Sequence, residues 1–155
     1  MLKLSVFEFL VRSIPEVLIF MFAIYSFSQT RLNRKRYLLS SLLLGICVFL
    51  IRMLPINYGV HTILNIIMIT VIACSINKID KLKAIRSSII MTIALFVCEG
   101  VNVAILSLVY GAELEILFKN SAIKTIYGLP SLVAFGAIVM IYYLYLKKKD
   151  KLSYV

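Results

Sequence analysis

Residues 87–109 have the sequence SSIIMTIALFVCEGVNVAILSLV, in which the single charged side chain is Glu99. The run is apolar throughout and does not alternate, so it predicts a helix and excludes a transmembrane strand. A bilayer core of about 30 Å is crossed by about 20 helical residues. We therefore expect residues 87–109 to cross a membrane.

Four further apolar runs flank this one, and they cover residues 14–28, 37–54, 56–76 and 126–146. Of all residues, 62% are apolar and 15% are charged, and the mean hydropathy is +1.00. A soluble domain has about 45–50% apolar and about 25% charged residues. We predict an all-α, polytopic integral membrane protein, with one bundle of about five transmembrane helices over residues 14–146.

The charge distribution predicts the orientation of this bundle. The chain carries 17 Lys and Arg against 7 Asp and Glu, a net charge of +10. The basic residues cluster in the first and third connections and in a tail of residues 147–155, which we expect to be cytoplasmic. The protein is thus predicted to be multi-pass in a cell membrane, with its N-terminus outside. The basic clusters suit anionic headgroups, so the expected partner is the lipid bilayer and not nucleic acid.

Residues 1–13 are predicted to form an interfacial amphipathic segment, because their charged and apolar side chains recur at helical spacing. The alternative is one long tilted helix that is kinked at Pro15. Ser13 and Glu16 have the spacing of a capping box, which predicts the start of the first membrane helix. We find no signal-peptide cleavage site and expect this helix to remain in the mature protein.

The connections carry further local signals. Residues 55–59 contain turn formers and predict a tight external hairpin. Residues 110–125 are long enough for a short amphipathic piece at the outer surface. Pro130 is predicted near the first turn of the last span.

Polar residues inside the third and fourth spans are the candidate site, because polar groups in lipid need a partner or a purpose. Glu99 and Asn102 share one helix face, and His61 and Asn65 share another. Counted from the outer ends of their spans, Asn65 and Glu99 both lie about 14–15 Å deep. We predict that these faces pack together, with Asn65 against Glu99 and His61 near Asn102. Arg52, at the outer end of the second span, either snorkels outward or points toward this cluster.

Three interpretations of the cluster remain open. It can form hydrogen bonds that hold the helices together, act as a ligand- or proton-sensing pocket open to the outside, or act as a proton relay in transport. We expect no cofactor and no metal site.

A membrane cysteine peptidase is disfavoured. His61 and Cys74 lie about 20 Å apart along one helix, too far for a nucleophile and its base. Cys47 and Cys98 lie at depths that allow contact with His61, but no orienting acid has a recognisable spacing. We expect all three cysteines to be packing residues and the protein to have no enzyme activity.

Residues 52–63, RMLPINYGVHTI, resemble the short connection in the membrane-embedded N-terminal input region of Gram-positive sensor histidine kinases of the peptide-pheromone, accessory-gene-regulator-like type. Residues 13–16 (SIPE), 98–102 (CEGVN) and 127–131 (YGLPS) fit the same pattern. In that family a dimerisation helix and an ATP-binding kinase domain follow the input region. Residues 147–155 hold neither a phosphoacceptor His nor a Gly-rich ATP-binding motif. The resemblance therefore implies a bacterial sensor-like module without the kinase domain, or a regulator that pairs with a membrane protein such as a sensor kinase.

The predicted function is accordingly a non-enzymatic membrane module for sensing or regulation. Its outer site, formed by His61, Asn65, Glu99, Asn102 and Arg52, is expected to bind a signal or a membrane partner. One alternative is a small subunit of a transporter or channel, which would act as a homo-oligomer or with a larger partner. The other is a structural or accessory membrane protein.

Overall fold

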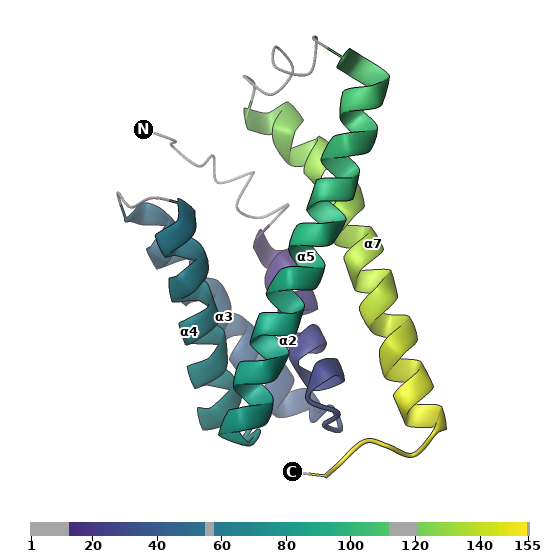
Figure 1. Cartoon of the computed structure of the whole chain (residues 1–155). Helices are drawn as coiled ribbons and strands as arrows, with labels where there is room; N and C mark the ends of the chain where they lie inside the picture. Colours follow the sequence, from purple (N-terminus) through teal and green to yellow (C-terminus); the bar gives the residue numbers. More distant parts are fainter. Residues whose placement is uncertain (1–12, 55–57, 112–120, 155) are drawn as a thin grey trace.

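The computed structural model describes residues 13–54, 58–111 and 121–154 of the chain. Five α-helices account for most of these residues (Figure 1). In chain order they are α2 (Ile14–Phe27), α3 (Arg34–Met53), α4 (Tyr58–Ser75), α5 (Lys81–Tyr110) and α7 (Ser121–Lys148). The predicted all-α fold is confirmed, and each predicted span overlaps one of these helices.

The helices differ in length. Among the described residues, α3, α5 and α7 are long and apolar enough to cross a membrane. The 30 residues of α5 extend for about 45 Å. The 14 residues of α2 and the 18 of α4 extend for only about 21 and 27 Å, less than the bilayer core of about 30 Å. At one end of the bundle, α5 and the start of α7 therefore reach beyond the other helices (Figure 1).

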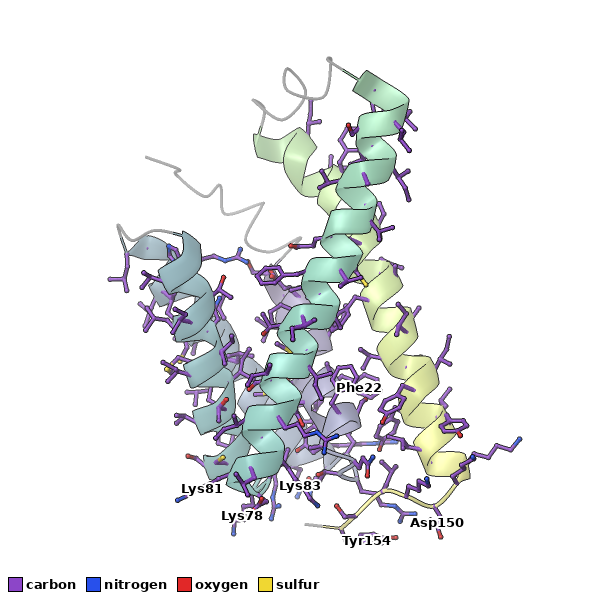
Figure 2. The ribbon with its side chains drawn as sticks, viewed as in Figure 1. Phe22, Lys78, Lys81, Lys83, Asp150 and Tyr154 are labelled. Carbon is purple, nitrogen blue, oxygen red and sulfur yellow. The ribbon has the colours of Figure 1, made fainter. Side chains whose placement is uncertain are left out.

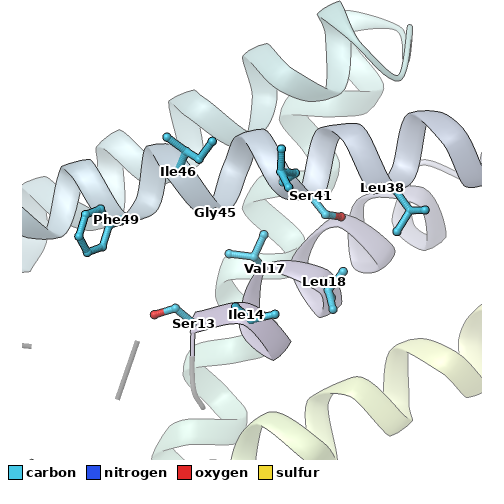
Figure 3. A pocket seen from close by; sticks show the side chains of 10 residues that line it. Ser13, Ile14, Val17, Leu18, Leu38, Ser41, Gly45, Ile46 and Phe49 are labelled. Carbon is cyan, nitrogen blue, oxygen red and sulfur yellow. The ribbon is translucent and has the colours of Figure 1, made fainter. Parts of the chain in front are cut away.

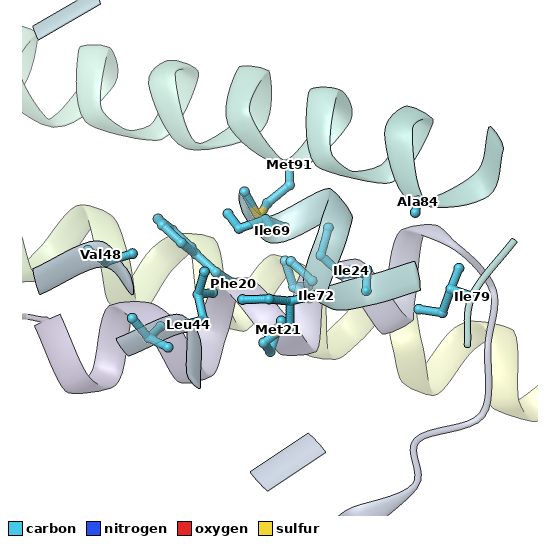
Figure 4. Packing of buried hydrophobic residues seen from close by; sticks show 14 of the residues in the cluster. Phe20, Met21, Ile24, Leu44, Val48, Ile69, Ile72, Ile79, Ala84 and Met91 are labelled. Atoms are coloured by element: carbon cyan, nitrogen blue, oxygen red, sulfur yellow. The ribbon is translucent and has the colours of Figure 1, made fainter. Parts of the chain in front are cut away.

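The shortest helix, α2, is also the central one. It packs against α3, α4, α5 and α7, and its side chains Met21, Ala23 and Ile24 have no exposed surface. The residues packed around them include Leu44, Ile72 and Met91 (Figure 4). Since α2 has neighbours on all sides, its sequence is apolar nearly all round.

The long helices also present apolar side chains to the outside. Leu42 of α3 is 66% exposed, Leu108 of α5 is 88% exposed and Ile141 of α7 is 68% exposed. Soluble proteins rarely expose contiguous apolar surface of this extent, whereas lipid tails match it. The described helices are therefore compatible with a membrane protein.

The basic segments gather at one end of the bundle. Lys78, between α4 and α5, and Lys81, the first residue of α5, lie at the same end as Asp150 and Tyr154 of the C-terminal tail (Figure 2). The connection between α2 and α3 lies there too, because the backbone N–H of Ser153 donates to the Gln29 carbonyl over 2.7 Å. We call this the basic end.

Side chains tighten the contact between the tail and the α2–α3 connection. The guanidinium of Arg31 lies 4.3 Å from the centre of the Tyr154 ring and forms an ion pair of 3.8 Å with Asp150. The backbone N–H of Arg31 donates to the Ser153 carbonyl over 2.9 Å. The end of α7 is thereby held against the first connection.

A buried polar contact joins α2 to the connection that follows α4. The Tyr25 hydroxyl of α2 donates to Oδ1 of Asn77, just after α4, over 2.8 Å. Both residues are 1% exposed. The contact fixes α2 to the connection between α4 and α5, and it leaves the side-chain oxygen of Asn77 satisfied.

One local prediction is confirmed in part and another is wrong: α2 begins directly after Ser13, as expected. Ser13 does not cap α2 with its side chain, because its hydroxyl accepts an N–H from Arg52 over 2.9 Å instead. Pro130 lies inside α7 and not near its first turn, because the helix begins at Ser121. The predictions for residues 1–12, 55–57 and 112–120 fall outside the described residues.

Candidate functional site

A small cavity of about 150 Å³ lies where α2, α4 and α5 meet. We call it the polar pocket, because five of its lining side chains are polar: Glu16, Thr62, Asn65, Thr92 and Glu99. Its other lining residues are apolar and include Phe20, Met91 and Phe96. Three helices thus bring ionisable and hydrogen-bonding groups together inside an apolar bundle.

Asn65 and Glu99 lie on this cavity together, as the matching of their depths predicts. The hydroxyls of Thr70 on α4 and Ser88 on α5 are 2.9 Å apart and join the two helices nearer the basic end. Each hydroxyl also lies within hydrogen-bond distance of a carbonyl of its own helix, so neither is left unpaired. This pair helps to set the register in which Asn65 and Glu99 face one cavity.

Arg52 points toward the cluster and does not snorkel away from it. Its Nη2 donates to Oε2 of Glu16 over 2.8 Å, and its Nη1 donates to the Ser13 hydroxyl over 2.9 Å. The side chains of Arg52 and Glu16 are 26% and 13% exposed. Because Glu16 lines the polar pocket, the ion pair forms one wall of the candidate site.

Glu16 is the site residue that sequence reasoning missed. Its spacing from Ser13 indicates only a capping box. The available signal was a different one: Glu16 lies near the start of an apolar run, and the outer end of the second run contains a lone basic residue, Arg52. Two isolated opposite charges at the same predicted level indicate a partnership across helices.

Asn102 has a partner on α7 that the sequence did not predict. Its Nδ2 donates to the Tyr127 carbonyl of α7 over 2.8 Å, and not to His61. Next to this contact, the hydroxyls of Tyr127 and Tyr110 are 3.1 Å apart. Asn102 therefore joins α5 to α7, one turn away from the polar pocket.

Two side-chain atoms near this end of the bundle are buried and unpaired. Within the described part of the chain, Oδ1 of Asn65 and Nδ1 of His61 have no hydrogen-bond partner. A buried polar atom without a partner costs about 1–3 kcal/mol, and native proteins hold few such atoms. The Asn65 oxygen is thus an acceptor available to whatever enters the polar pocket.

The arrangement suits binding better than covalent chemistry. Carboxylates, an amide and threonine hydroxyls can hold a small polar or protonated group. Cys47, Cys74 and Cys98 are free thiols that pack against the hydrophobic core, as expected. None of the three lines the polar pocket as described.

Comparison of this chain with protein-family models, with curated proteins and with solved structures finds no match.

Proposed function

We propose that this protein is a non-enzymatic, multi-pass membrane module of the sensor or regulator kind, which binds a signal or a membrane partner in the polar pocket. The observation that carries the proposal is the meeting of Glu16, Asn65 and Glu99, from three helices, on one cavity in an apolar bundle. Ionisable groups are expensive inside a membrane, and those that occur there mark functional sites.

In this proposal all five helices cross a bacterial cell membrane, with the N-terminus outside and the basic end in the cytoplasm. Support comes from the gathering of three basic segments at one end of the bundle, which is the pattern of positive-inside topology. The short helices α2 and α4 require local thinning of the bilayer, or help from flanking residues. The polar pocket then opens toward the outer half of the membrane.

The resemblance of residues 52–63 to the input region of peptide-pheromone sensor kinases supports the sensor-like role. Arg52, in this stretch, contacts the pocket through Glu16. At the other end of the bundle, the tail contacts the α2–α3 connection. In this proposal, a partner such as a sensor kinase would bind at the tail. Asn65, Glu99, Glu16 and Arg52 form the proposed site, while Asn102 serves as scaffold.

Thiol labelling tests whether the polar pocket is reached by water from outside. The background lacks the three native cysteines, and single cysteines replace Thr62, which lines the pocket, or Ile63, which is 58% exposed on the neighbouring helix face. A membrane-impermeant thiosulfonate added to intact cells should modify Thr62→Cys and not Ile63→Cys, which faces lipid at the same depth. Equal labelling of the two would contradict an outward-opening pocket.

Binding is tested with the full chain, purified from its native membrane in mild detergent. Mass spectrometry compares the molecules retained by the wild type, Glu99→Gln, Asn65→Leu and the control Asn102→Leu. The control removes an amide from the same depth range but from outside the pocket. We expect the two pocket variants to lose a molecule that the wild type and the control keep. If both pocket variants retain the same molecules as the wild type, the role of the cluster is to hold the helices together by hydrogen bonds.

The orientation has a separate test. Single cysteines at Lys35 and Lys148 should both be protected from the impermeant reagent in intact cells and both become reactive after permeabilisation. Labelling of the two from opposite sides of the membrane would overturn the topology and the depth matching with it.

A further inference from the structure

A second cavity lies between α2 and α3, and it shares no lining residue with the polar pocket. Its volume is about 490 Å³, which is within the range of about 300–1,000 Å³ for small-molecule sites. It is a groove with α2 on one side and α3 on the other (Figure 3). Apart from two serines and Gly45, its lining is apolar.

The groove runs along the helix axis. On α3 the lining extends from Leu38 to Phe49, which corresponds to about 17 Å. Leu38, Leu42 and Ile46 on its rim are 61%, 66% and 50% exposed, so the groove opens toward the surrounding lipid. Gly45 gives it depth, because a Cβ built there meets no heavy atom within 4 Å.

The cationic side chain of Arg52 lies at one end of the groove. Ser13 lines that end, and its hydroxyl accepts the Nη1–H of Arg52 over 2.9 Å. Arg52 also lies three residues after Phe49, on the same face of α3. Its contacts with Ser13 and Glu16 leave further guanidinium N–H groups, out of five in all, and its side chain is 26% exposed.

We propose that the α2/α3 groove binds one acyl chain of an anionic phospholipid, whose phosphate is held by Arg52. The apolar groove matches the chain, and guanidinium matches phosphate in charge and in the fork geometry of its donors. The proposal depends on the membrane placement given above, but not on ligand binding in the polar pocket. In the proposed orientation this lipid belongs to the outer leaflet.

The chain contains no Trp, which allows a single fluorescent reporter. Phe49→Trp places an indole in the groove, and Leu108→Trp places one on an 88% exposed position of α5. Each variant is reconstituted in vesicles with increasing fractions of brominated phosphatidylglycerol or brominated phosphatidylcholine. We expect the groove indole of Phe49→Trp to reach half-quenching at an about fivefold lower fraction of the anionic lipid, the factor expected for one basic side chain. The indole of Leu108→Trp should respond equally to the two lipids.

A matched pair of glycine variants tests whether the groove causes the preference for the anionic lipid. Gly45→Leu fills the groove, whereas Gly100→Leu adds the same bulk on α5, where a Cβ also meets nothing within 4 Å. In the Phe49→Trp background, Gly45→Leu should abolish the lipid preference and Gly100→Leu should preserve it. Equal quenching of the groove indole by both lipids, or a preference that survives Gly45→Leu, would overturn the proposal.

Two further variants keep the result interpretable. Glu16→Gln removes the anion that competes for Arg52, so the preference for phosphatidylglycerol should increase, and an unchanged or smaller preference would contradict the role of Arg52. Glu99→Gln lies outside the groove and should leave the lipid preference unchanged. Failure of lipid binding is thus distinguished from failure of the polar pocket.

Discussion

Buried asparagines at the basic end and in the polar pocket differ in whether their side-chain oxygen accepts a hydrogen bond. At the basic end, Oδ1 of Asn77 accepts the Tyr25 hydroxyl over 2.8 Å, and both residues are 1% exposed. In the polar pocket, Oδ1 of Asn65 is buried with no partner among the described residues. The same functional group is a completed contact in one region and an unused acceptor in the other.

The difference separates scaffold from candidate site. A satisfied intramolecular hydrogen bond contributes about 1 kcal/mol to stability, while an unsatisfied buried group costs about 1–3 kcal/mol. In an apolar bundle, the completed contacts at the basic end therefore stabilise the fold. The unpaired oxygen of Asn65 lowers stability, and binding of a ligand or partner would recover the loss.

The largest expected effect comes from the ion pair that borders the pocket. Arg52→Gln would leave Glu16, 13% exposed, without its cation, and we expect a loss of about 3 kcal/mol in the free energy of unfolding. Denaturation in mixed micelles measures it. The double variant Arg52→Gln/Glu16→Gln should recover most of the loss, and a double variant as unstable as the single one would assign the loss to another contact of Arg52.

The same substitution at the two asparagines should have different effects on stability. Asn77→Leu should cost about 2 kcal/mol, because it leaves the buried Tyr25 hydroxyl without its acceptor. Asn65→Leu removes an oxygen that has no partner among the described residues, so it should leave the unfolding free energy unchanged or raise it. Measured in the same micelles, an equal loss in both variants would contradict the distinction between scaffold and pocket.

Asn102 provides an intermediate case. It lies near Glu99 in sequence, but its amide donates to the Tyr127 carbonyl of α7. Asn102→Leu should cost about 1 kcal/mol, the range for interhelical hydrogen bonds in membranes, and should leave binding in the polar pocket intact. A loss of bound ligand without a loss of stability would move Asn102 back into the site.

The smallest effect is expected at the surface of the basic end. Arg31→Ala removes an exposed ion pair with Asp150 and the contact with the Tyr154 ring. Exposed pairs contribute little, and the backbone hydrogen bonds of Ser153 remain, so the unfolding midpoint should not shift measurably. A large shift would show that side chains, and not the backbone, hold the tail in place.

Part of the site could be predicted because it follows from counting along helices. The depths of Asn65 and Glu99 depend only on the rise per residue and on the positions of the turns. The partners of Arg52 and Asn102 depend instead on how helices are arranged around one another. Arg52 reaches Glu16 because α2 packs beside α3, and Asn102 reaches Tyr127 because α7 packs beside α5. No spacing within one helix contains that information.

Local signals failed for the same reason. Ser13 has the spacing of a capping residue, but a guanidinium from α3 binds its hydroxyl. Pro130 resembles a first-turn proline, but α7 begins at Ser121, and helices in an apolar bundle tolerate an internal proline when neighbours restore lost contacts. At Ser13, a tertiary contact outweighed the local preference.

The amino-acid sequence by itself determined that the chain is helical and apolar enough for a membrane, since composition and run length set the solvent that each segment can tolerate. It also determined that ionisable groups occur inside those runs. Only the tertiary structure decided which helix is central, which charges pair, and that an asparagine and two glutamates from three helices share one cavity. The physical reason is that hydropathy acts on each segment alone, whereas partners are selected by packing between segments.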